Sequence, residues 1–340
     1  MRPMSTRPLS KLSLLAVVPL AALAACATSQ GAPAPAAPTN GSFPGAGPAT
    51  ALPEPTTGAF ESLEGPLWVA AQHALLFSDV VEKNGDAAHI YRFDPSVRAY
   101  TVVATPETSP TSTNGLAVDP QGRLIATERY NGRLVRIEQD AKSNGKLTVL
   151  ASRWPAADGP ALNAPNDVVV RADGNIYFTD SDWGVRPDGA HAPMAVYRVS
   201  PTGELSRVLE LQKPNGIALS PDGATLYVGS DTQAKVWRLP LDGSGAAGQP
   251  VLLIDGATVP GGFKVPDGIC VDDTGNLYVT NNDDAVKAIV VFDPAGHELG
   301  RIPVPFRPSN CTFGGADRRT MYVTTLHAVF ELRVPTPGLP

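Results

Sequence analysis

Clusters of positive charge, cysteines and enzyme fingerprint motifs are all scarce in this chain of 340 residues. The formal net charge is -6 without a basic cluster, which argues against nucleic acid as a partner because a phosphate backbone is bound by concentrated positive charge. Neither Cys270 nor Cys311 has a His or Cys at metal-ligand spacing, which argues against a thiolate zinc site. The lack of a Gly-x-Ser-x-Gly elbow, a P-loop and a dinucleotide fingerprint argues against serine hydrolases and nucleotide-dependent enzymes.

Long apolar runs are also rare, and the most prominent one lies near the N-terminus. The run from Leu12 to Ala25 follows a basic stretch and is too short to span a bilayer as a helix, which is typical of a secretory signal. It leads into Cys26 through Leu-Ala-Ala, which resembles a bacterial lipobox. Residues 1–25 are therefore expected to be a lipoprotein signal peptide and Cys26 to be lipidated; an ordinary signal peptide with an incidental cysteine is the alternative.

The residue after the lipid site predicts the location. Ala27 stands where an aspartate is associated with retention in the inner membrane. We therefore expect an exported protein that is lipid-anchored in the outer membrane, faces the periplasm and has no other membrane contact.

Composition divides the rest of the chain into a tether and one large domain. Residues 26–55 are dominated by Ala, Pro, Gly, Ser and Thr and are expected to form a disordered, extended tether. The chain is 43% hydrophobic and 18% charged, so the segment 56–335 can bury the core of a single β domain. We expect this domain to be a monomer.

The most informative stretch is a hairpin pattern near the middle of the chain. Two alternating segments, 167–171 and 175–180, flank an Ala-Asp-Gly turn, which predicts two antiparallel strands and brings Asn166 near Asp180 and Ser181 at one rim. Related stretches recur along the chain, and each begins with a polar residue that we call an anchor. The six anchors are Glu64, Asn114, Asn166, Asn215, Asp267 and Asn310.

The spacing of the anchors predicts the fold. Successive anchors are 50, 52, 49, 52 and 43 residues apart, and the segments between them are rich in Gly and Pro turns. Six sheet units of this period cannot bury their faces separately, so we predict an all-β, six-bladed β-propeller with a central metal site. The last repeat offers only three strands, and we expect the N-terminal segment, with a lone strand near 57–63, to supply the missing outer strand.

The chemistry of the anchors predicts the metal. Each anchor carries a carboxylate or a carboxamide, and no Lys or Arg stands at these positions to balance Glu64 and Asp267. Two carboxylates gathered in a partly buried channel repel each other, and a cation relieves that cost. Oxygen ligands without sulfur or imidazole favour a hard divalent ion, calcium first, with magnesium, manganese or zinc as alternatives. For any single anchor, a simple turn at the start of a strand is the alternative.

Taken together, the repeated motifs resemble the senescence marker protein/gluconolactonase family, six-bladed propellers that include regucalcin and, more distantly, diisopropyl fluorophosphatase. The resemblance spans nearly the whole chain after the tether, in family order. The matching segments are EGPLW at 64–68, LFSD at 76–79, PNDVVV at 165–170, YFTD at 177–180, PNGIALSPDG at 214–223, PDGICVD at 266–272 and NCTFGG at 310–315.

The resemblance implies an axial divalent ion and the hydrolysis of a small-molecule lactone or ester. In the family, the ion is held by the Glu of E-G-P-x-W, the Asn of N-D, the Asn of P-N-G and the Asp of P-D-G. The matching positions here are Glu64, Asn166, Asn215 and Asp267. The ion is expected to polarise the ester carbonyl while Asp267 activates water as a general base; a nucleophilic Asp267 is the alternative.

Two departures from the family pattern bear on the substrate. Ala164 stands where regucalcin-like members carry an arginine, so a clamp on a sugar lactone is missing there. Many bacterial relatives read E-H-G-N where this chain has Glu128, Arg129, Tyr130 and Asn131, which puts gluconolactone itself in doubt. A non-catalytic binding propeller and a phosphotriesterase of the fluorophosphatase type are the alternative functions.

The hairpin geometry also predicts the wall of the pocket, because the ends of the second strands lie at the same rim. The expected substrate-binding residues are Asn114, Glu128, Arg129, Asp180, Trp183 and His327. We expect Arg129 to pair with Glu128 or to meet a substrate carboxylate, and Trp183 to stack on a sugar ring or to cover the channel. An exposed loop position is the default for His327, and a spare general base is the alternative.

The two cysteines of the domain lie on inner strands of neighbouring repeats. Export makes a disulfide between Cys270 and Cys311 conceivable. Two buried thiols are the expectation.

Overall fold

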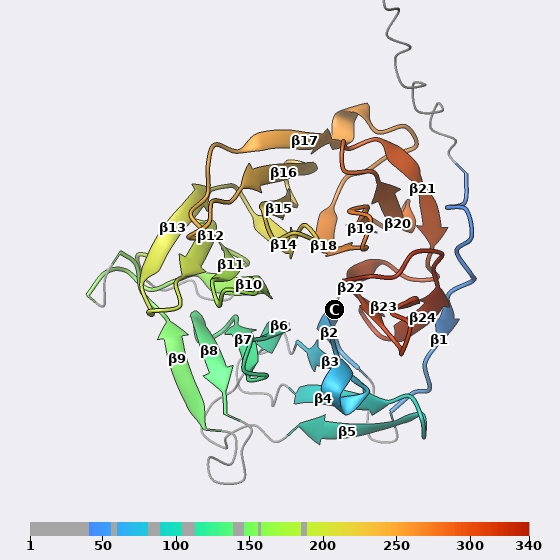
Figure 1. Ribbon diagram of the computed structural model, residues 1–340, viewed down its shortest axis with the longest axis horizontal. Helices are drawn as coiled ribbons and strands as arrows, with labels where there is room; N and C mark the ends of the chain where they lie inside the picture. Colours follow the sequence, from blue (N-terminus) through green and yellow to red (C-terminus); the bar gives the residue numbers. More distant parts are fainter. Residues whose placement is uncertain are drawn as a thin grey trace, which may run out of the picture. The chain divides into compact units, whose positions relative to one another are not determined.

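The chain forms a ring of six four-stranded antiparallel sheets (Figure 1). A computed structural model describes residues 41–55, 60–80, 89–103, 113–138, 146–155, 158–184 and 189–339. Strand order within the sheets confirms the predicted all-β, six-bladed propeller. Within these ranges, no helix has the length and apolar character needed to cross a membrane. The signal peptide and Cys26 lie outside the described residues.

Each blade runs from an innermost strand outward in chain order. Blade one contains β2 (Leu63–Val69), β3 (Ala74–Asp79), β4 (His89–Asp94) and β5 (Ala99–Val103). Blade two contains β6 (Thr113–Val118), β7 (Leu124–Glu128), β8 (Arg133–Ile137) and β9 (Leu147–Ala151). Blade three contains β10 (Ala164–Val170), β11 (Ile176–Ser181), β12 (Ala195–Val199) and β13 (Leu205–Glu210).

The other half of the ring repeats this arrangement. Blade four contains β14 (Pro214–Leu219), β15 (Thr225–Ser230), β16 (Lys235–Pro240) and β17 (Val251–Asp255). Blade five contains β18 (Pro266–Val271), β19 (Leu277–Asn282), β20 (Lys287–Phe292) and β21 (Glu298–Pro303). Blade six contains β22 (Pro308–Gly314), β23 (Thr320–Thr325), β24 (Val329–Arg333) and β1 (Thr50–Ala51).

The hairpin of blade three shows why the sequence folds in this way. Gly174 has a φ of +89°, a conformation that side chains disfavour, and its N–H donates to the carbonyl of Arg171. Asp173 Oδ1 accepts the N–H of Asn175 at 3.0 Å, which fixes the turn. Pro165 then lies opposite Asp180, so the rim predicted from the sequence forms.

The ring closes where the N-terminal segment meets the last blade. Strand β1 pairs antiparallel with β24, which confirms that the N-terminal segment supplies the missing outer strand. The residues that do so, Thr50 and Ala51, precede the expected strand near 57–63, of which 57–59 fall outside the described residues.

The described part of the segment assigned to the tether packs against the propeller. Phe43 is buried in the core of blades five and six, and its N–H donates to Arg301 O at 2.7 Å. Leu52 is buried with Phe60 and Trp68. The propeller therefore begins before residue 55, because these apolar side chains recover the free energy of burial, on the order of 2 kcal/mol each.

The core lies between neighbouring blades rather than in one central mass. Tyr278 of blade five packs edge-on against Phe313 of blade six with ring centroids 5.2 Å apart. Trp68 of blade one stacks on Tyr322 of blade six at 5.7 Å. Because each sheet buries both faces against its neighbours, the ring holds the innermost strands in fixed positions around the axis.

Candidate metal centre

A β-bulge re-aims the chain at every anchor. Each innermost strand shifts its register at or beside the anchor, as between Pro165 and Val168 in β10 and between Pro266 and Ile269 in β18. The other four shifts lie in β2, β6, β14 and β22. A bulge bends the strand and redirects a side chain, so six polar residues are brought toward the axis.

Glycines let these bulges approach one another closely. A Cβ on Gly216 would stand 2.0 Å from Asp267 O, and one on Gly268 would stand 2.1 Å from Asn310 Oδ1. Gly65 has a φ of +54°, and its Cβ would stand 2.0 Å from Asn114 O. A side chain at any of these positions would separate neighbouring blades, so glycine is what allows the blades to converge here.

Hydroxyl groups fasten five of the six anchor regions to the preceding blade. From the second strands, Ser78 donates to Asn114 O at 2.8 Å, and Thr127 donates to Asn166 O at 2.6 Å. Thr179 and Thr280 do the same for Asn215 O and Ser309 O, each at 2.8 Å. Ser309 Oγ donates to Leu63 O at 2.6 Å, which links blade six to blade one. These bonds hold the anchor backbone rigidly.

Three carboxylates lie within electrostatic range of one another near the axis, one more than the sequence predicted. Burial raises the pKa of Glu64 well above its usual range, and the charges of Asp267 and Asp167 raise it further, while Gly65 N–H and Arg129 lower it. Glu64 keeps some contact with solvent, whereas Asp267 and Asp167 are 5% and 7% exposed. Such mutual repulsion is the electrostatic signature of a site for a cation.

Asp267 is held by two amides. Asn282 Nδ2 donates to Asp267 Oδ2 at 2.6 Å, and Asn215 also hydrogen-bonds this carboxylate. Burial raises the pKa of Asp267 to about 7; the charges of Asp231 and Asp167 add to the shift, and the two amides oppose it. Three predicted ligands, Glu64, Asn215 and Asp267, therefore interact.

The fourth predicted ligand, Asn166, lies in the bulge of β10 and is buried. Its neighbour Asp167 was missed by the sequence analysis. Burial raises the pKa of Asp167 to about 6, and its oxygens accept the N–H of Val168 at 2.9 Å and of Ile217 at 3.3 Å. Asp167 stands where four other blades have glycine after the anchor, which is the one signal that could have identified it.

The residues present fit a hard divalent cation. Two buried amide oxygens near the axis, Asn114 Oδ1 and Asn282 Oδ1, have no hydrogen-bond partner. Across the described ranges, no three His, Cys, Asp or Glu side chains gather as a metal site by themselves, so amide oxygens must complete the ligand set. Carboxylate and amide oxygens are the ligands that calcium and magnesium prefer.

Two residues predicted to line the pocket have partners within their own blades. Glu128 forms an ion pair with Arg133. Asp180 Oδ2 accepts the backbone N–H of Asn163 at 2.9 Å and its amide at 3.1 Å. Asp180, near the end of β11, thus holds the loop that leads into β10, because its buried carboxylate accepts hydrogen bonds from N–H groups of that loop.

The other second-strand residues predicted to line the pocket differ in burial and in contacts. Arg129 is partly buried and its charge acts on Glu64, which places it toward the axial site. Lys213 Nζ lies 4.5 Å from the ring centroid of Trp183, so one face of that indole is covered by a cation. His327 occupies an exposed loop, as expected by default, and its Nδ1 lies 3.2 Å from Phe60 O.

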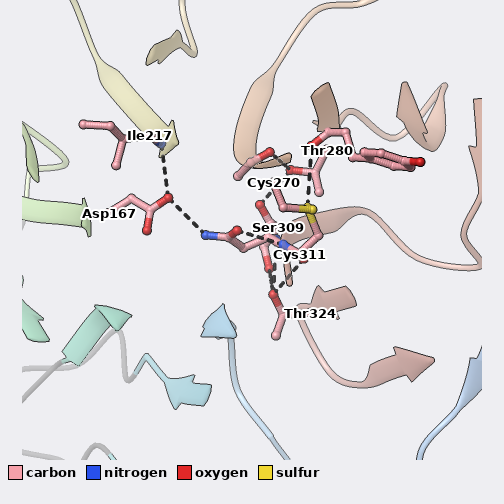
Figure 2. Close-up of a disulfide and its surroundings, with 10 residues drawn as sticks. Asp167, Ile217, Cys270, Thr280, Ser309, Cys311 and Thr324 are labelled. Atoms are coloured by element: carbon pink, nitrogen blue, oxygen red, sulfur yellow. Dashed lines mark hydrogen bonds between the residues drawn. A yellow bond between two sulfur atoms is a disulfide. The ribbon is translucent and has the colours of Figure 1, made fainter. Parts of the chain in front are cut away.

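The expectation of two buried thiols is wrong. Cys270 of β18 and Cys311 of β22 form a disulfide between blades five and six (Figure 2). Their Cα atoms are 5.9 Å apart, within the range that a disulfide spans. Neighbouring inner strands converge toward the axis, and this distance could not be read from sequence spacing.

A cavity of about 530 Å³ lies along the inner strands beyond the anchors. Its lining includes Val170, Leu219 and Val271, at the strand ends farthest from the predicted rim, together with Asp167 and Asn310. This cavity therefore lies on the other side of the axial carboxylates from the predicted substrate wall.

Comparison with known proteins adds a family match and several relatives. The family described as SMP-30/Gluconolactonase/LRE-like region matches residues 63–327. A gluconolactonase of Zymomonas mobilis is 31% identical over 293 residues, which cover 81% of this chain and 79% of the relative. The lactonase drp35 of Staphylococcus aureus is 33% identical over 237 residues, 57% of this chain and 70% of the relative.

A solved structure shares both fold and sequence. The gluconolactonase of Xanthomonas campestris aligns with a TM-score of 0.68 and 32% identity, covering 85% of this chain and 98% of that chain. The fold of this chain is therefore shared with that enzyme over most of both chains.

Proposed function

Because this chain belongs to the SMP-30/gluconolactonase/LRE-like family, we propose that it is a divalent-metal-dependent hydrolase of lactones. Relatives named gluconolactonase and lactonase support a lactone hydrolase. The observation that supports the metal dependence is that Glu64, Asp167 and Asp267 lie near the axis within electrostatic range of one another, each with a raised pKa. A site that repels its own charges in this way is suited to hold a cation.

The proposed ligands are Glu64, Asn166, Asn215 and Asp267, with calcium first and magnesium, manganese or zinc as alternatives. When bound, such an ion supplies a Lewis acid that polarises the lactone carbonyl. Asp267 accepts a proton from the attacking water and returns it to the ring oxygen as the carbon–oxygen bond breaks. Asn282 orients Asp267 by its 2.6 Å hydrogen bond, so the carboxylate faces the reacting water in one conformation.

The charges of the site favour a neutral substrate. The two positive charges of the ion and the one of Arg129 balance the three carboxylates at Glu64, Asp167 and Asp267. The charge of Asp231, which also acts on Asp267, is offset by that of Lys213. An uncharged lactone enters such a site without leaving an unpaired charge. Arg129 then hydrogen-bonds ring hydroxyls instead of binding a substrate carboxylate.

Charge does not separate a lactone from a phosphotriester, since both are neutral. We expect one preparation to hydrolyse several five- and six-membered lactones at least about 10²-fold faster, by kcat/KM, than a phosphotriester. A pH-stat assay across both substrate sets measures this ratio. Preferred turnover of the phosphotriester would reassign the chemistry while leaving the metal site in place.

We also propose that the protein is exported and lipid-anchored in the outer membrane through Cys26, which lies outside the described residues. Labelled fatty acid is expected to enter the wild-type chain and not Cys26→Ser, which is expected in the soluble fraction. Equal labelling of both chains would contradict the anchor.

A further inference from the structure

A hydrogen bond between two opposite blades crosses the axis. Asn310 Nδ2 of blade six donates to Asp167 Oδ2 of blade three at 3.4 Å. Blades three and six lie opposite each other, with β10 and β22 facing across the centre of the ring (Figure 1). The bond therefore spans the channel, and both of its residues also line the cavity beyond the anchors.

Asp167 accepts a second hydrogen bond, from blade four. The same Oδ2 accepts the N–H of Ile217, the residue two positions after the anchor Asn215 of blade four. Figure 2 shows Asp167 between Ile217 on one side and blade six on the other. Its charge acts on both Glu64 and Asp267, so the orientation of this carboxylate sets the field at the proposed ligands.

Asn310 is fixed by its own surroundings. Its Oδ1 accepts the N–H of Cys311 at 2.8 Å, and its backbone N–H donates to Thr324 Oγ1 at 3.2 Å. The disulfide ties Cys311 to Cys270, three residues after Asp267 on β18. The strand that carries Asn310 and the strand that carries Asp267 are therefore covalently joined beside the axis.

We propose that Asn310, held in place by the Cys270–Cys311 disulfide, is a positioning residue that sets Asp167 across the axis and so builds the inner floor of the metal site. This inference rests on the proposed function for the metal, while the bridge itself is a hydrogen bond between two residues of the chain. The floor separates the proposed ligands from the cavity beyond, so substrate approaches from the rim. Outer partners that orient a ligand shell typically change metal affinity by about 10–100-fold when removed.

The test compares Asn310→Ala with Asn276→Ala by calorimetric titration of calcium into the metal-free, oxidised protein. Asn276 Nδ2 also donates to an aspartate, Asp272 Oδ2 at 2.9 Å, but in a turn of blade five away from the axis. We expect Asn310→Ala to raise the Kd about 10-fold or more and Asn276→Ala to leave it within about 3-fold of wild type. If Asn310→Ala does not fold, Asn310→Ser is the substitute, since its hydroxyl is too short to reach Asp167.

The outcomes separate the inference from the proposed function. Wild-type protein that binds no divalent ion contradicts the proposed function, whereas binding with an unchanged Kd in Asn310→Ala contradicts the inference alone. A crystal structure of metal-free Asn310→Ala gives a reading independent of metal. We expect the Asp167 carboxylate to leave its place beside Ile217; an unchanged position would overturn the positioning role.

The disulfide is tested in the same titration. The double variant Cys270→Ser/Cys311→Ser is expected to raise the Kd about 3-fold or more, because Asn310 loses its fixed support. A lower melting temperature with an unchanged Kd would show that the disulfide only stabilises the fold, and would remove it from the proposal.

Discussion

Asp267→Asn is expected to lower kcat for a lactone by about 10²–10⁴-fold while the protein stays folded and binds its metal. An asparagine keeps an oxygen that can coordinate the ion, but it cannot accept the proton of the attacking water. The loss should therefore fall on kcat more than on metal affinity. Steady-state kinetics together with calcium titration measure both effects.

The substitution also carries a stability signature. Because Asp267 and Glu64 repel each other in the metal-free protein, removing one charge is expected to raise the melting temperature of that form. The matched control is Asp293→Asn in the same blade, where the carboxylate accepts N–H bonds of Ala295 and His297 in a turn. Turnover of Asp267→Asn within about 3-fold of wild type would contradict the role of Asp267 as the general base.

Complete removal of the metal is expected to lower lactone turnover by at least about 10²-fold, because Lewis-acid stabilisation supplies several kcal/mol. Restoring calcium should restore turnover, and the other divalent ions rank by the recovery they give. The melting temperature should fall on chelation, since an ion that binds only the folded state stabilises it. Chelator saturated with calcium is the control for effects of the chelator itself.

Elemental analysis must confirm that the chelated protein holds no metal. Undiminished hydrolysis by such protein would rule out the metal-dependent mechanism. The positions of Glu64 and Asp267 would then require another explanation.

The repeat pattern was sufficient to predict the fold. Six anchors some fifty residues apart predict six sheet units in a ring, and glycine follows four of these anchors. The blades converge at such glycines, since a Cβ on Gly216 would meet Asp267 O at 2.0 Å. A closing strand from the N-terminal segment was predicted correctly, but its expected place in the chain was too late. Phe43 and Leu52 lie in a segment whose Ala and Pro content suggested a tether. Two well-placed apolar side chains outweighed the local composition.

The site was only partly predictable because strand position does not reveal where a side chain points. Asp167 follows an anchor directly, yet the bulge of β10 brings it to the axis as well. Asp180 ends a second strand at the rim, yet it binds Asn163 of its own loop. Register and bulges decide between these outcomes, and they depend on packing between blades rather than on the motif.

The position of the ion is the most direct test of the whole proposal. A crystal of the protein soaked in a calcium or manganese salt, measured for anomalous scattering, should show one peak on the axis. It should lie within about 2.0–2.6 Å of oxygens from Glu64 and Asp267. A peak elsewhere, or Glu64 and Asp267 held apart or neutralised by basic side chains, would contradict it.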